Sequence, residues 1–486
     1  MPELGVGLVY WPALTPLFEG GGDVIDVLEL EPQSLWEKVR RFGKWHYEQN
    51  DALFEKVQAF PQPKLIHGVG QPLGGLTADP VEHLDLLRQT VTSMRPAWAS
   101  EHLSFNRVGS MRGVEETGFL LPPRQSPAGV RVAADNIDAF RASLGCPVAF
   151  ETGTNYLQPR DDEMGDGEFF HAVSSEADCG ILFYLHNLWC NELNGRARVA
   201  DVIDRLPLER VWEVHVAGGT ELNGYTLDAH SGRVHPRLIE LVAEILPRLP
   251  NLGALIFEIL PEHVASIGID GVHRQLEELR AVLPHTPSRS VDLTLLAKPP
   301  RARSRPDDVV EVQVWEGGLA AAIRGGSADD SWFGDVCEDP GLLIYRELVG
   351  DFRRAATARC LRYTMTALLL GLGCRQTQEM LDDYFMQQTP DAFAAVEAEH
   401  VAQYLQSRRD MTSRIPHLAE VLTFEHALLR ATLYDEASDI EWTADPIAIF
   451  EALDDGRLPE ALPPIVSRMR MTVRHDHDVA PCEARR

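Results

Sequence analysis

The stretch Pro147–Asn155, PVAFETGTN, decides the fold that we expect for this chain of 486 residues. Its apolar residues suit a buried parallel strand, which ends in the carboxylate of Glu151 before Gly153 opens a loop. Chemistry carried on the C-terminal end of a strand is typical of a (β/α)8 barrel. We therefore interpret Glu151 as one member of a site built from strand ends.

Seven other stretches have the same strand-like character. Between Gly5 and Leu260 they read GVGLVYW, VIDVLEL, KLIHGVG, WASEHLSF, GILFYLHN, VWEVHVAG and LGALIFEIL. Helix-compatible stretches such as 80–94 and 130–144 separate most of them. Apolar strands that alternate with helices form parallel sheets, and eight such units predict closure. We predict an α/β fold, with a (β/α)8 TIM barrel as the metal-binding catalytic domain in residues 1–283.

The rest of the chain has a different character. Residues 284–308 are rich in Pro, Ser and Arg, which predicts a linker. Apolar residues at helical spacing over 343–372 and 391–434 predict a mostly α-helical domain in residues 309–474. The final residues, 475–486, are expected to form a tail.

Charge and composition argue against some binding partners of the protein. The net charge of -28 argues against broad nucleic-acid binding, which needs clustered Lys and Arg. The N-terminus has no secretory pattern and no apolar run is long enough to span a bilayer, so we expect a cytoplasmic protein without a membrane partner. The seven cysteines form no CxxC pair, which favours reduced core thiols.

Histidines and carboxylates recur where the predicted strands end. Each alone has a structural explanation, such as a hydrogen-bonded core histidine at His67 or a partnered carboxylate at Glu101. Together they predict a metal centre, because converging imidazoles and carboxylates are costly to bury unless cations neutralise them. Such donors suit non-haem iron, manganese or zinc, in at least two ions. The candidate ligands are His67, His102, Glu151, His186 or Asn187, His215, Asp228, His230 and Glu258.

Some neighbouring residues are open to two interpretations. Asp228 and His230 would face the same way in an extended segment, but a turn closed by the Asp side chain explains the pair equally well. Asn155 and Tyr156, which follow Glu151, are candidates for shaping the pocket. The patterns GxxxxGK[ST], GxGxxG after a strand and GxSxG are absent, which argues against a phosphate cradle or a serine nucleophile.

The motifs HGVG, SEHLSF, ETGTNYL, LHNLWCN, VHVAGG and DAHSGRVH together resemble the multinuclear non-haem iron-dependent oxidative enzymes, also called domain of unknown function 692. The resemblance runs from about Gly5 to His263. It implies a xylose-isomerase-like barrel that binds two or three mixed-valent Fe(II)/Fe(III) ions and uses dioxygen. Its implied substrate is a ribosomally synthesised precursor peptide, modified at Cys in natural-product biosynthesis such as that of methanobactin.

The resemblance also implies roles for single residues. The metal ligands that it implies are the candidates named above, with Glu151, His215 and Asp228 as catalytic residues. Two positions depart from the family pattern: Tyr184 stands where members commonly have Asp, and Tyr10 and Trp11 stand near the place of a missing first-strand His.

Residues 389–434, and above all IPHLAEVLTFEHA, resemble the helical partner proteins that accompany these enzymes. This implies a peptide-recognition role fused to the barrel, whereas a generic helical bundle is the alternative. A separate recognition protein remains a further possibility. The rival functions are another metal-dependent barrel enzyme, such as a sugar isomerase or an endonuclease, and a non-catalytic peptide-binding scaffold.

Overall fold

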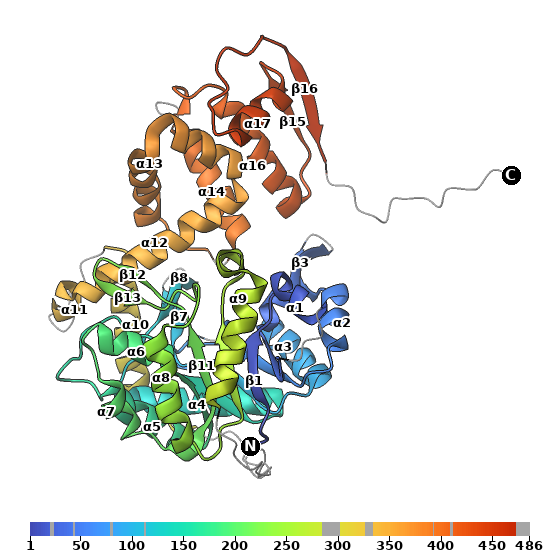
Figure 1. The fold of residues 1–486 in the computed structure, drawn as a ribbon. Helices are drawn as coiled ribbons and strands as arrows, with labels where there is room; N and C mark the ends of the chain where they lie inside the picture. The colour runs from blue at the N-terminus through green and yellow to red at the C-terminus, as the bar shows by residue number, and fades with distance from the viewer. Residues whose placement is uncertain are drawn as a thin grey trace. The chain divides into compact units, whose positions relative to one another are not determined.

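Eight parallel strands form a closed barrel in the computed structural model, in the order β1-β14-β11-β10-β9-β6-β5-β2 (Figure 1). The structure describes residues 1–19, 24–41, 44–77, 81–110, 113–283, 302–325, 334–391, 393–408 and 412–472. The barrel strands are β1 (Gly5–Val9), β2 (Val27–Leu30), β5 (Lys64–Gly68), β6 (Ala99–His102), β9 (Val148–Glu151), β10 (Gly180–Tyr184), β11 (Val211–Ala217) and β14 (Ala254–Glu258). Each lies in one of the predicted stretches, so the barrel prediction is confirmed.

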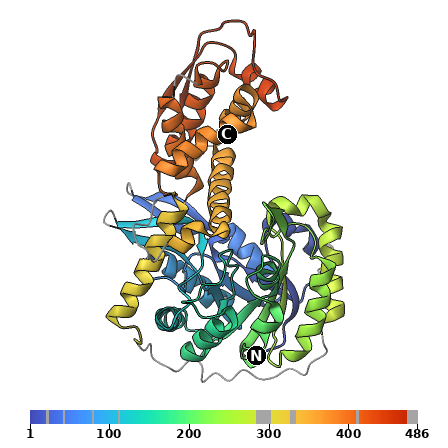
Figure 2. The ribbon, with the colours of Figure 1, turned by 90° about the vertical axis from the view of Figure 1, so that its left-hand side faces the viewer.

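Helices surround the barrel strands (Figures 1 and 2). They are α1 (Pro16–Glu19), α2 (Asp51–Ala59), α3 (Val81–Met94), α4 (Pro127–Leu144), α5 (Asp166–Ala177), α6 (Leu185–Leu193), α7 (Val199–Ile203), α8 (Pro236–Ile245) and α9 (Pro261–Val282). Local sequence fixes their ends: at α4, the side chain of Ser126 accepts from the Gly129 amide at 3.3 Å, and Gly145 ends the helix at φ 69°. Apolar side chains of these helices pack on those of the strands.

The strand register brings polar strand ends next to one another. His102 lies opposite Glu151, and Tyr184 lies opposite His215. Since all eight strands are parallel, their C-terminal ends lie on one rim of the barrel.

Three hairpins interrupt the alternation of strands and helices, and the sequence analysis did not anticipate them. They are β3 (Trp36–Arg41) with β4 (Lys44–Gln49), β7 (Phe105–Ser110) with β8 (Gly113–Leu121), and β12 (Thr220–Leu222) with β13 (Tyr225–Leu227). In the last of these, Asn223 and Gly224 turn the chain at φ 50° and 83°, as Asn-Gly hairpin turns require. This hairpin leads directly to Asp228 and His230.

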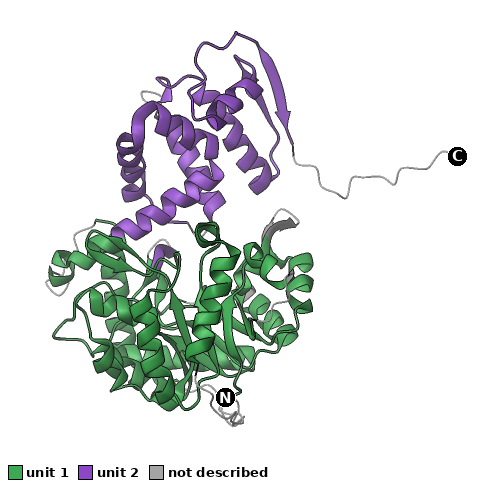
Figure 3. Ribbon diagram, in the orientation of Figure 1, with its two compact units in different colours: residues 1–114, 120–345 green, residues 115–119, 346–486 purple. Residues whose placement is uncertain are grey.

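The chain divides into two compact units, residues 1–114 with 120–345 and residues 115–119 with 346–486 (Figure 3). Helix α10 (Pro306–Ile323) belongs to the first unit, because its Trp315 donates to the Pro122 carbonyl at 2.9 Å and its Glu316 accepts from the Leu76 amide at 2.8 Å. Helix α11 (Gly334–Glu338) follows it. The longer segment of the second unit thus begins at residue 346, later than the expected linker 284–308, of which residues 284–301 lie outside the described residues.

The second unit is mostly helical, as predicted. Its elements are the greater part of α12 (Pro340–Cys360), α13 (Arg362–Gln387), α14 (Ala394–Ser407), α16 (Leu418–Tyr434) and α17 (Pro446–Asp454), with a hairpin of β15 (Ser438–Trp442) and β16 (Ser467–Met471). The predicted helix over 343–372 is broken at Leu361, and Glu425 accepts from the Tyr363 and Thr364 amides at 2.8 and 2.7 Å where α13 begins. The predicted tail lies outside the described residues.

Among the described residues, none of the helices has both the length and the apolar character needed to cross a membrane.

Candidate metal centre

Three neighbouring strands bring His67, His102 and Glu151 together. Nε2 of His67 lies 3.0 Å from Oε2 of Glu151, and Nε2 of His102 lies 3.7 Å from Oε1 of the same carboxylate. The other nitrogen of each ring is held by the fold: Nδ1 of His67 lies 2.9 Å from Oγ of Ser100, and Nδ1 of His102 lies 3.2 Å from the Gly68 carbonyl. Both imidazoles therefore direct Nε2 at one carboxylate, as metal ligands held from behind would do.

His215 lies deeper in the barrel, between carboxylates on both sides of its ring. Nδ1 is 3.2 Å from Oε1 of Glu258, while Nε2 is 2.9 Å from Oε2 of Glu29 and 3.5 Å from Oε1 of Glu213. The indole of Trp98 donates to the second oxygen of Glu213 at 2.8 Å. His215, Glu29 and Glu213 are fully buried.

Asp228 and His230 form the third part of the cluster. Nε2 of His230 lies 3.0 Å from Oδ1 of Asp228 and 3.4 Å from Oε2 of Glu258. The hydroxyl of Tyr184 donates to the same Oδ1 of Asp228 at 3.3 Å. Glu258 thus faces both His215 and His230, and it links the deep part of the cluster to the part on the loop.

His186 and Asn187 differ from the expectation that they end a strand. The strand ends at Tyr184, and both residues lie in the first turn of α6. Nε2 of His186 lies 3.9 Å from Oδ1 of Asp228 and 3.4 Å from Sγ of Cys190, whereas Asn187 donates to the Thr152 carbonyl at 3.5 Å. His186 is therefore the member of this pair that lies nearer to Asp228.

Mutual attraction between the imidazoles and carboxylates shifts their titration. Burial alone would lower the pKa of His67, but Glu151 raises it to about 10. Burial would likewise lower the pKa of His230, yet Asp228 and Glu258 raise it to about 10. Burial would raise the pKa of Glu258, but His230 and His215 hold it well below its usual range. Carboxylates that stabilise protonated imidazoles this strongly also attract metal cations. Metal ions therefore compete with protons for the imidazole nitrogens.

The donor atoms fit a bound cation. Several buried atoms at the cluster have no well-aligned hydrogen-bond partner in the described part of the chain: Oε2 of Glu151, Oε2 of Glu258, both ring nitrogens of His215 and Nδ1 of His186. Buried polar atoms without partners are costly. The residues His67, His102 and Glu151 offer atoms within 4.8 Å of one another, and so do Glu29, Glu213 and His215. Nitrogen and oxygen donors in this mixture suit iron, manganese or zinc.

Three carboxylates at this centre were not among the predicted ligands. Glu29 and Glu31 come from the stretch VIDVLELEP, which was interpreted only as a strand, and burial raises the pKa of each to about 7. Glu213 precedes His215 by two residues on the same face of β11. The sequence contained a signal for these residues. A carboxylate within an apolar barrel strand must face either the barrel interior or the surrounding helices, and both are buried.

The loop after Glu151 lies next to this centre. The hydroxyl of Tyr156 accepts from the Asp228 amide at 3.3 Å, and Asn155 is fixed by Asn191, whose side-chain oxygen accepts from its amide at 2.9 Å. Both contacts position the loop that carries residues 152–165.

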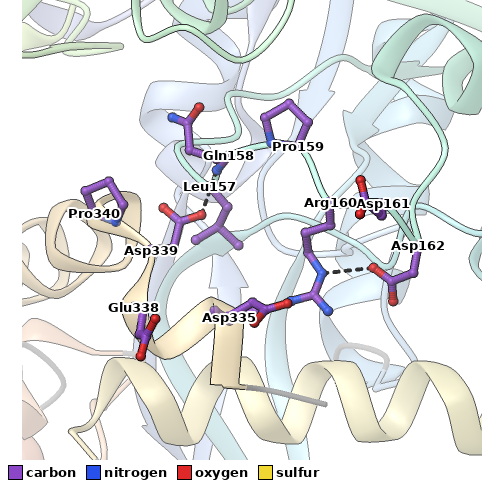
Figure 4. A pocket seen from close by; sticks show the side chains of 11 residues that line it. Leu157, Gln158, Pro159, Arg160, Asp161, Asp162, Asp335, Glu338, Asp339 and Pro340 are labelled. Atoms are coloured by element: carbon purple, nitrogen blue, oxygen red, sulfur yellow. Dashed lines mark hydrogen bonds and ion pairs between the residues drawn. The ribbon is translucent and has the colours of Figure 1, made fainter. Parts of the chain in front are cut away.

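A groove of about 610 Å³ lies where this loop faces the start of α12 (Figure 4). Its described lining, residues 157–162, 335–336 and 338–340, contains none of the candidate ligands. Two of its carboxylates make structural contacts: Asp339 accepts from the Gln158 amide at 2.8 Å, and Asp162 pairs with Arg160 at 3.0 Å. The groove is thus separate from the cluster of donor atoms.

A closed (β/α)8 barrel with two groups of candidate metal ligands defines the class of fold and site. Residues 39–283 match the family model described as RiPP precursor modification enzyme MbnB/TglH/ChrH. A UPF0276 protein of Chromobacterium violaceum is 30% identical over 231 residues, which are 48% of this chain and 82% of the relative. The chain belongs to the MbnB/TglH/ChrH family of RiPP precursor modification enzymes.

Other similarities are more distant. A UPF0276 protein of Anaeromyxobacter sp. is 29% identical over 217 residues, 45% of this chain and 74% of the relative. Among solved structures, a xylose isomerase domain protein from Planctomyces limnophilus has a TM-score of 0.36 at 14% identity, covering 58% of this chain and 96% of that one. An L-ribulose 3-epimerase has a TM-score of 0.36 at 11% identity, covering 58% and 93%.

Proposed function

We propose that this chain is an iron- and dioxygen-dependent enzyme that oxidatively modifies a ribosomally synthesised precursor peptide, at a Cys residue, in natural-product biosynthesis. The observation that carries the proposal is the convergence of four imidazoles on Glu151, Asp228 and Glu258 at one end of the barrel. Membership of a family of precursor modification enzymes supports a peptide as the substrate.

Two sets of residues would hold the metal. His67, His102 and Glu151 form the first set. Asp228, His230 and Glu258 form the second, with His215 behind Glu258 and His186 near Asp228, and the proposal extends to two or three ions. Iron, when bound, would supply the activation of dioxygen and a binding position for a substrate thiolate, which is a soft ligand.

The protein's own part is to hold the metal ligands in place and to exclude water from them. Glu151 directs its two oxygens at two different histidines, so its loss would disturb both. Glu258 connects His215 with His230, and Asp228 fixes the ring of His230. Because Glu151, His215 and Glu258 are buried, water has little access to the donor atoms, which strengthens their electrostatic interactions.

We further propose that the second unit contributes to recognition of the peptide. It would either replace a separate recognition protein or act together with one. The resemblance of residues 389–434 to the helical partners supports this role. The proposed setting is cytoplasmic, where precursor peptides are made and thiols stay reduced.

Metal analysis of protein purified without oxygen tests the proposal. The wild type should hold two or more irons per chain, and Glu151→Ala and His215→Ala should lose iron. His273→Ala is the matched control, because His273 is half exposed on α9, with Nδ1 3.6 Å from Oε2 of Glu277. Iron-loaded wild type should then consume dioxygen only with the precursor peptide present.

Other results would favour the rival functions. Turnover of a sugar without dioxygen would support an isomerase. A wild type that binds peptide but takes up no iron, even after anaerobic reconstitution, would support a non-catalytic scaffold.

A further inference from the structure

Tyr184 is a buried phenol enclosed by candidate ligands. It ends β10 with only 1% of its surface exposed. The centre of its ring lies 5.4 Å from that of His215, in an edge-on arrangement, and 5.8 Å from that of His230. The ring of His186 is 6.2 Å away.

The spacing of the oxygen atoms at Tyr184 fits a shared ion. Its hydroxyl lies 3.3 Å from Oδ1 of Asp228, which is long for an O–H···O bond, usually about 2.7–2.8 Å. Two donor atoms that are each about 2.0–2.2 Å from one metal lie about 3–3.5 Å apart at octahedral or tetrahedral angles. Nε2 of His230 is also 3.0 Å from that oxygen of Asp228. The two contacts to Asp228 are therefore spaced as neighbouring ligands would be.

We propose that the hydroxyl oxygen of Tyr184 is a ligand of the ion held by Asp228 and His230. The identity of that ion as iron rests on the proposed function. When the ion binds, the phenol proton passes to water and the oxygen binds as a phenolate, so the step involves no change of oxidation state. Tyr184 would thus supply an anionic oxygen donor from β10 to the part of the cluster on the loop.

Visible absorption and resonance Raman spectra test this assignment. Wild-type protein is reconstituted with iron without oxygen and then oxidised, and its iron content is measured. A phenolate bound to iron(III) gives a visible charge-transfer band and enhanced tyrosinate ring vibrations. Wild type should show both, and Tyr184→Phe should lose both while it keeps iron at the site of His67, His102 and Glu151.

Tyr156→Phe is the matched control, because Tyr156 is also buried but its hydroxyl contacts the Asp228 amide rather than the carboxylate. This variant should keep the band and the vibrations. Bands that persist in Tyr184→Phe would overturn the assignment.

The wild type alone decides the matter if Tyr184→Phe does not fold. Iron-loaded, oxidised wild type without tyrosinate vibrations would overturn the role of Tyr184 and leave the proposed function intact. A wild type that takes up no iron would overturn both.

Discussion

Nε2 of His215 lies 2.9 Å from Oε2 of Glu29, and neither side chain is exposed. The opposite nitrogen of the ring, Nδ1, faces Glu258 at 3.2 Å. Metal-binding imidazoles usually direct their second nitrogen at a carboxylate, which fixes the ring and raises its basicity. Glu29 is thus placed to hold Nδ1 of His215 toward the metal centre.

Changing Glu29 to Gln should weaken metal binding. The substitution keeps the shape of the side chain but removes the charge that orients His215, and loss of such support costs about 10–100-fold in metal affinity. Competition with a chelator measures the change. Glu240→Gln, on an exposed face of α8, is the control. Equal affinities for Glu29→Gln and wild type would show that Glu29 does not position the ring.

Gly68→Ala should destabilise the barrel, because the new Cβ would lie 2.4 Å from Oε2 of Glu101. That oxygen accepts from the Gln71 amide at 2.9 Å, so the carboxylate cannot move without losing this bond. We expect a loss of about 1–3 kcal/mol in the free energy of unfolding, measured by urea denaturation. Gly109→Ala, where no atom lies within 4 Å of the new Cβ, should stay within about 0.5 kcal/mol of wild type. Equal effects of the two substitutions would contradict the packing argument.

Glu316 should make the stability of the first unit depend on pH. Burial raises the pKa of its carboxyl group to about 8, above the ordinary value of 4.5. A raised folded-state pKa means that the folded chain binds the proton more tightly, so this contribution is complete below pH 4.5 and is lost as pH rises through about 8. Glu316→Gln keeps an acceptor for the Leu76 amide and removes the titration.

Thermal unfolding of both proteins between acidic and mildly alkaline pH measures this effect. Relative to Glu316→Gln, the wild type should lose stability as pH rises from about 5 to about 9. A constant difference between the two melting temperatures over this range would show that Glu316 titrates normally.

Two ion pairs of the second unit should differ greatly in their effect on stability. Glu397 and Arg353 are buried, and Oε1 of Glu397 lies 2.7 Å from Nη2 of Arg353. Glu397→Ala leaves a buried cation without its partner and should lower the free energy of unfolding by about 3–5 kcal/mol. Glu379 and Arg375 lie 2.8 Å apart but are 60% and 89% exposed, so Glu379→Ala should cost about 0–1 kcal/mol. Chemical denaturation followed by circular dichroism compares them. Costs of similar size would argue against burial as the cause.

The barrel could be predicted from sequence because each strand is a short apolar run that ends in a polar residue, as at Glu151. The pairing of His102 with Glu151 follows once the strands close, since neighbouring parallel strands end together. Local patterns also predicted helices at 80–94 and 130–144, where the structure has α3 and α4. The place of these residues as ligands stays a prediction.

Other features depend on contacts that no local pattern shows. Helix α10 packs on the first unit through Trp315 and Pro122, which are 193 residues apart in the chain. Composition could not show this contact, so the sequence analysis grouped α10 with the C-terminal helices. Glu29 and Glu213 were missed because ligands were sought only at the ends of the predicted strands. His186 was assigned to a strand end because the helical character of LHNLWCNEL was not used.

The chain enters the second compact unit twice, first with residues 115–119 of β8 and then from residue 346 onward. Within that unit, a Cβ on Gly118 would lie 2.8 Å from Pro390 and 3.1 Å from Val349, so the short segment packs closely against the later one. A truncation at residue 345 would leave residues 115–119 on the barrel without these neighbours. A single cut between residues 345 and 346 therefore does not separate the two compact units, because β8 supplies residues to both.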